Sequence, residues 1–121
     1  MHPKDKQFLI DMITRYSVST SRLHADSTSY VINLPDNRLI TIGCMELPDG
    51  EGGLDLYYNA SIDDELLDEV VINQNDKPIS TSALDIINLM KLCSTKIIAQ
   101  EMLSQQSKFM MTSIIDRKQY N

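Results

Sequence analysis

The sequence predicts an α+β fold in a single domain, residues 1–121. Between residues 30 and 62 apolar residues alternate with polar ones, which is the period of strands with one buried face. On either side of that interval they recur every three or four residues, which is the period of amphipathic helices. With 121 residues and 42% apolar content, the chain can build one core without disulfide bonds. We therefore expect an N-terminal helix, a three-stranded antiparallel meander, a short acidic helix and a long C-terminal helix.

The first helix is expected over residues 3–16, where apolar residues follow the i, i+1, i+4, i+5, i+8 spacing of one buried stripe. Residues 17–29 are rich in serine and threonine and poor in apolar side chains, so we expect a loop there. The stripe of the first helix consists of Phe8, Leu9, Met12, Ile13 and Tyr16.

Three strands are expected to follow. Residues 30–34 and 38–47 form the first two, joined by a turn at Pro35–Asn37 in which proline fixes φ and asparagine accepts a left-handed conformation. A glycine-rich hairpin loop over residues 48–53 leads to the third strand, Leu54–Ile62, where the alternation is clearest. This pattern predicts an antiparallel meander with one buried and one wetter face.

A short acidic helix is expected after the meander. Residues 63–65 are Asp-Asp-Glu, and carboxylates are favourable at the N-terminus of a helix. Its buried side is then formed by Leu66, Leu67, Val70 and Val71.

The long helix is expected over residues 80–106. Hydroxyl side chains at 80–82 can cap its N-terminus, and Asp85 suits the positive end of the helix dipole. Its apolar arc is wider than a surface helix needs, so either neighbouring elements or a second copy of the chain cover it. Residues 108–115 suit either a closing strand or further helix.

Charge and hydropathy limit the classes of partner. The net charge is −6, and between Arg38 and Lys77 ten acidic residues occur without a single lysine, arginine or histidine. A field of this sign repels phosphate, so we expect neither nucleic-acid binding nor binding to anionic membranes. No apolar run reaches the length of a membrane span, and the first residues do not resemble a secretory signal. Two cysteines far apart in the chain are expected as reduced thiols, which favours a cytoplasmic location.

No catalytic, cofactor or metal signature is present. His2 and His24 are not spaced as metal ligands, and His24, Asp26 and Ser27 lie too close together on one loop for a catalytic triad. Residues 49–52 lack the alternating oxygen ligands of a calcium loop. We therefore expect a protein that is not an enzyme and binds neither cofactor nor metal.

The order of elements resembles the class I effector chaperones of bacterial type III secretion. The resemblance covers roughly residues 8–103, and that family adds two further strands and a final helix. It rests on the opening helix at residues 8–16, on the runs Ser-Tyr-Val-Ile-Asn-Leu at 29–34 and Leu-Ile-Thr-Ile at 39–42, on residues 54–58, and on Ser-Ala-Leu-Asp-Ile-Ile-Asn-Leu-Met at 82–90.

The resemblance implies a non-enzymatic homodimer that holds an extended segment of a secreted effector, a role in bacterial virulence. Apolar patches on the first helix and the sheet would bind that segment. An alternative hypothesis, based on the acidic interval alone, is an inhibitor, immunity protein or DNA mimic that blocks a basic site on a target protein. Its acidic surface would consist of Asp63, Asp64, Asp68 and Glu69. The candidate residues for the chaperone-like surface are Phe8, Met12, Tyr30, Ile32, Ile40 and Ile42.

Overall fold

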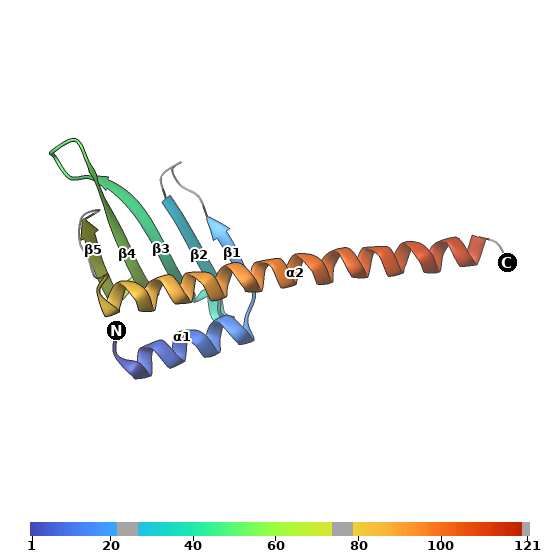
Figure 1. The fold of residues 1–121 in the computed structure, drawn as a ribbon. Helices are drawn as coiled ribbons and strands as arrows, with labels where there is room; N and C mark the ends of the chain where they lie inside the picture. Colours follow the sequence, from blue (N-terminus) through green and yellow to red (C-terminus); the bar gives the residue numbers. More distant parts are fainter. Residues whose placement is uncertain (22–26, 74–78, 120–121) are drawn as a thin grey trace.

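A computed structural model describes residues 1–21, 27–73 and 79–119, with side chains described as far as residue 111. The described residues fold as α+β: one five-stranded antiparallel sheet, with the strands in chain order, and two helices. Figure 1 shows α2 running across one end of the sheet with α1 beside it, and then continuing well beyond β1. The elements are α1 (Pro3–Arg15), β1 (Val18–Ser21), β2 (Ser27–Asn33), the 3-10 turn η1 (Pro35–Asn37), β3 (Leu39–Pro48), β4 (Leu54–Ile62), β5 (Glu65–Asn73) and α2 (Thr81–Gln119).

The core lies between the helices and one face of the sheet. Cross-strand partners occupy that face, with Ile32 opposite Ile40 and Ile42 opposite Ala60. All four side chains are fully buried, so the alternation seen in the sequence is confirmed here. The helices contribute the other side of the core through Leu9 and Ile13 of α1 and Ile86, Leu89 and Cys93 of α2.

The loop expected over residues 17–29 is wrong in part, because β1 and the start of β2 lie within it. Residues 22–26 fall outside the described part of the chain. Val18 is buried, and both its backbone N–H and its carbonyl bond to the side-chain amide of Gln100 on α2. A single buried apolar residue therefore anchors this edge strand, too few for an alternation to be visible in the sequence.

The prediction of a short acidic helix after the meander is wrong, because residues 65–73 form strand β5. Asp63 and Asp64 have φ of 50° and 66°, which makes a two-residue hairpin turn of the left-handed kind that matches the twist of paired strands. The Asp63 carboxylate also accepts hydrogen bonds from Arg38 Nε (2.8 Å) and from the backbone N–H of Leu39 (3.0 Å). These bonds fix the turn against the start of β3, and pairing with β4 outweighs the preference of acids for a helix N-terminus.

Helix α2 is longer than expected and includes residues 108–115. Of the two alternatives for these residues, further helix is therefore correct and a closing strand is wrong. The hydroxyl of Ser80 accepts from the N–H of Ala83 (3.3 Å), which confirms a hydroxyl cap at the start. After Pro78 the sequence contains neither glycine nor proline, so nothing breaks the helix. Its 39 residues span about 58 Å. Among the described residues, no helix is both long enough and apolar enough to cross a membrane.

Candidate functional site

A concave surface lies where the sheet extends beyond α2. We call it the sheet–helix groove; its volume is about 500 Å³. Strands β2, β3 and β4 supply one wall and one side of α2 supplies the other. The lining residues are Ser27, Thr28, Tyr30, Cys44, Glu46, Leu56, Tyr58, Ile87, Met90, Lys91 and Ser94.

The strand pattern explains why these side chains converge. Thr28, Cys44 and Tyr58 are successive cross-strand partners, so they share one face of the sheet. That face is the one that forms the core further along the strands, where α2 covers it. On α2, groove residues 87, 90, 91 and 94 follow the i, i+3, i+4, i+7 spacing of one helix side. The groove is therefore the uncovered continuation of the core.

The groove offers apolar contact and hydrogen bonding at neutral groups. Burial raises the pKa of the Cys44 thiol and the pKa of the Tyr58 phenol beside it. Cys44 therefore stays protonated near neutral pH, unlike an activated nucleophile. The exposed side chains of Glu46 and Lys91 add one negative and one positive group. Such a surface suits a ligand with apolar side chains and uncharged polar groups.

The six residues expected to bind a partner are divided among three places. Tyr30 lines the sheet–helix groove. Phe8, 38% exposed, and Met12 line a separate hollow of about 240 Å³ beside η1. Ile32, Ile40 and Ile42 are 0% exposed and lie in the core of the protomer.

Of the lining residues, the sequence reasoning named only Tyr30 as partner-binding, and it missed the four other large apolar ones, Leu56, Tyr58, Ile87 and Met90. The alternation in β4 does place Leu56 and Tyr58 on the face that carries Ala60. Which part of that face stays uncovered depends on where α2 crosses the sheet, and periodicity carries no information on this.

The four acidic residues expected to form one surface do not share a face. Asp68 lies on the side of the sheet that bears the helices, whereas Glu69 accepts a hydrogen bond from the Tyr57 hydroxyl on the other side. Asp63 and Asp64 form the β4–β5 turn. Hydrogen bonds from Arg38 and from the backbone of Leu39 lower the pKa of the Asp63 carboxyl.

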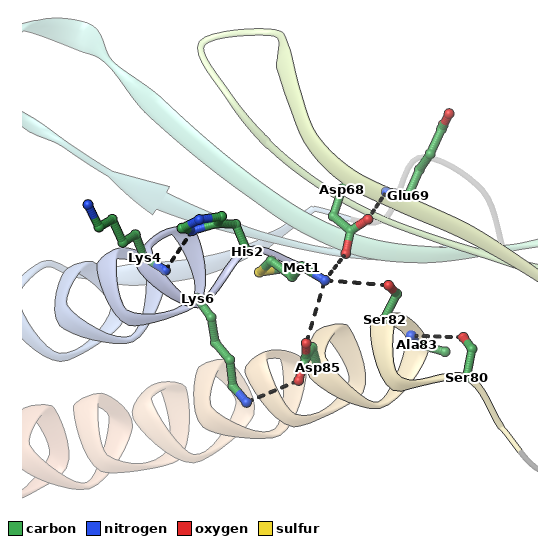
Figure 2. Close-up of polar contacts among 10 residues, drawn as sticks. All are labelled: Met1, His2, Lys4, Lys6, Asp68, Glu69, Ser80, Ser82, Ala83 and Asp85. Atoms are coloured by element: carbon green, nitrogen blue, oxygen red, sulfur yellow. Dashed lines mark hydrogen bonds and ion pairs between the residues drawn. The ribbon is translucent and has the colours of Figure 1, made fainter.

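A cluster of charges joins α1, β5 and α2 (Figure 2). The buried amino group of Met1 lies 3.2 Å from Asp68 Oδ2 and 3.7 Å from Asp85 Oδ2, and Lys6 Nζ lies 3.0 Å from Asp85 Oδ1. The same amino group lies 3.4 Å from the hydroxyl of Ser82. Two carboxylates and two cations offset one another, so the cluster fastens the N-terminus to the body. Among the described residues, no three His, Cys, Asp or Glu side chains are placed to hold a metal ion.

The far half of α2 presents apolar side chains without cover from the described residues of its own chain. Every residue from 101 to 111 is exposed, in contrast to the buried positions between 83 and 93. The large apolar side chains here are Ile98, Met102, Leu103, Phe109, Met110 and Met111, each between 55% and 73% exposed.

Comparison with protein-family models, curated proteins and solved structures finds no match to this chain.

Proposed function

We propose that this protein is a small, non-enzymatic, chaperone-like binding protein of the cytoplasm. It holds an extended, nonglobular segment of another polypeptide and acts as a homodimer. The observation that carries the proposal is the sheet–helix groove, an uncovered continuation of the core that is walled by Tyr30, Leu56, Tyr58 and Met90.

A polypeptide fits the chemistry of the groove better than a charged metabolite. Apolar walls suit aliphatic and aromatic side chains, while the hydroxyls of Thr28 and Ser94 suit the N–H and carbonyl groups of an extended backbone. The net charge of −6 keeps the complex dispersed and favours basic segments. The sequence resemblance to class I effector chaperones suggests a secreted effector as the source of the segment, although the short helix expected from that resemblance is strand β5.

The proposal is tested with a permanently unfolded, basic polypeptide such as fluorescently labelled, reduced and carboxyamidomethylated lysozyme. Fluorescence anisotropy at about 0.15 M salt measures its binding to the full chain. Leu56→Glu and Met90→Glu each place a charge in the apolar wall, and we expect either to weaken binding at least about tenfold, since removing a charge from water is costly.

The matched control is Val71→Glu, because Val71 is 53% exposed and lies on β5 outside the groove. It adds the same charge and should leave affinity unchanged. Failure of the wild-type protein to bind the unfolded chain, or equal loss in all three variants, would contradict binding in the groove.

The alternative, an acidic inhibitor of a basic target, ranks second. The run of acids without a base between Arg38 and Lys77 motivates it. Because Asp68 and Glu69 lie on opposite sides of β5, a blocking surface would have to centre on the turn at Asp63 and Asp64. If this alternative holds, neutralising the four acids together abolishes binding to the target, while Leu56→Glu does not affect it.

A further inference from the structure

We infer that the far half of α2 pairs antiparallel with the same segment of a second copy of the chain, and that Phe109 of each copy fills a hollow between α1 and α2 of the other. This deepens the homodimer of the proposed function by naming its surface. The sheet–helix groove has no part in the pairing, so the two proposals can fail separately.

The hollow is the first observation. It lies between α1 and α2, has a volume of about 270 Å³, and is walled chiefly by Ile10, Ile13, Leu92 and Ala99. Leu92 and Ala99 stand in one row with Leu103 and Met110, at intervals of seven, four and seven residues along the helix. The hollow is therefore continuous with the exposed apolar stripe of α2.

The second observation is that α2 carries both Phe109 and one wall of the hollow. In a two-fold symmetric pair, a residue i that contacts j implies that j contacts i. If Phe109, 73% exposed, meets residues 95–99 of the partner, the two-fold axis passes near Leu103. Met102 and Leu103 then meet their own copies at the centre, and both hollows are filled.

A parallel pair lacks this fit. Phe109 would meet its own copy, about 15 Å along the helix from Ala99 and the hollow. A parallel pair would also place two protomers, each of net charge −6, side by side. In the antiparallel pair the bodies lie towards opposite ends, further apart than the screening length of about 8–10 Å, and the helix dipoles oppose each other favourably.

The exposed area matches what a stable dimer needs. Five side chains of the stripe, each more than half exposed, present on the order of 100 Å² apiece, and the walls of the hollow add to this. Both copies together would bury about 1,000–1,200 Å², the lower end of the range for specific interfaces. Without such cover, a solvated helical extension of this length is only marginally stable. The five residues are Ile98, Met102, Leu103, Phe109 and Met110.

The mass of the full chain in solution tests the pairing. At micromolar concentration, sedimentation equilibrium should give twice the chain mass of 13.7 kDa. Met102→Glu and Phe109→Glu should each raise the dissociation constant at least about 100-fold. Any loss of helix content by circular dichroism should be no larger than the far half of α2 contributes. The control is Ser104→Glu, which adds the same charge on the side of the helix that faces away from Met102 and Phe109 and should leave the dimer unchanged.

Cysteine pairing tests the orientation. In the antiparallel pair Ala99 faces Gln106 of the partner, so chains carrying Ala99→Cys and chains carrying Gln106→Cys should form a mixed disulfide when combined. Ala99→Cys alone should not cross-link, because the two copies of that residue lie about 10 Å apart along the helices.

A monomeric wild-type chain, or cross-linking of Ala99→Cys to itself, would overturn the inference. A dimer that survives Phe109→Glu would overturn it as well. Failure of a dimeric wild-type protein to bind the unfolded polypeptide would instead count against the groove alone.

Discussion

Removal of one carboxylate from the N-terminal charge cluster gives a direct test of how the helices are fastened to the sheet. Asp85 is 8% exposed, and it lies 3.0 Å from Lys6 Nζ and 3.7 Å from the Met1 amino group. Asp85→Asn keeps the shape of the side chain and removes its charge. We expect the free energy of unfolding to fall, because the buried Met1 amino group then keeps only the carboxylate of Asp68.

The magnitude follows from the distances. At an effective dielectric constant of about 20, unit charges 3–4 Å apart attract by about 4–6 kcal/mol. Desolvation of the buried ions offsets most of this gain. The Lys6 contact is worth less, since its side chain is 43% exposed and the pair is screened. We expect a net loss of about 1–3 kcal/mol for Asp85→Asn and about 1 kcal/mol or less for Lys6→Ala.

Urea unfolding at pH 7 and one fixed protein concentration provides the assay. With a slope of ~1–3 kcal/mol per molar urea, a loss of 2 kcal/mol lowers the midpoint by about 1 M. Glu101→Gln is the matched control, because it removes the same charge from an exposed position of the same helix. Equal stability of Asp85→Asn and Glu101→Gln would refute a fastening role for the cluster.

Three further outcomes are expected. Leu89→Ala empties a fully packed site and should cost about 2–5 kcal/mol, whereas Leu84→Ala at a 45% exposed site should cost less than about 1 kcal/mol by the same urea assay. Asp64→Val should destabilise the β4–β5 turn by about 1–2 kcal/mol, because Asp64 has a φ of 66°, while Asp64→Gly should be neutral or stabilising. Burial raises the pKa of Cys93 to about 12, so at pH 8 a thiol reagent should modify Cys93 only on unfolding and should reach Cys44 first.

Strands β3 and β4 were predictable because the alternation in the sequence matches the register of the sheet, in which Ile40 lies opposite Ile62 and Ile42 opposite Ala60 on the core face. Ile40, Ile42 and Ala60 are fully buried, and the turn at Pro35–Asn37 has the left-handed φ of 60° expected at Asn37. Local pattern and tertiary packing agree there, so a single sequence suffices.

Strand β5 was missed for an instructive reason. Its apolar residues fit a helical stripe, and a bulge at Ala60 and Ser61 disturbs the alternation relative to β4. What decides for a strand is the left-handed turn at Asp63 and Asp64, which aspartate adopts less readily than glycine or asparagine. The sequence left residues 108–115 open between a closing strand and further helix, because the adjacent apolar residues at 109–111 and 114–115 fit neither period uniquely.

The residues of the candidate site could likewise be predicted only in part. Tyr30 could be named from the sequence because it heads an alternating strand, and it does line the groove. Ile32, Ile40 and Ile42 belong to the same pattern but lie under the helices. Which of these residues is covered depends on where α2 crosses the sheet. That position is a property of the tertiary structure and cannot be read from the periodicity of the strands.

The central claim is that another polypeptide covers apolar surface that this chain leaves open. Hydroxyl-radical footprinting with and without the unfolded lysozyme chain tests it most directly, since it reports side-chain exposure residue by residue. We expect oxidation of Leu56, Tyr58 and Met90 to fall on binding, and oxidation of Tyr57 and Val71, which lie outside the groove, to stay unchanged. Unchanged oxidation of the three groove residues at saturating polypeptide would contradict the claim.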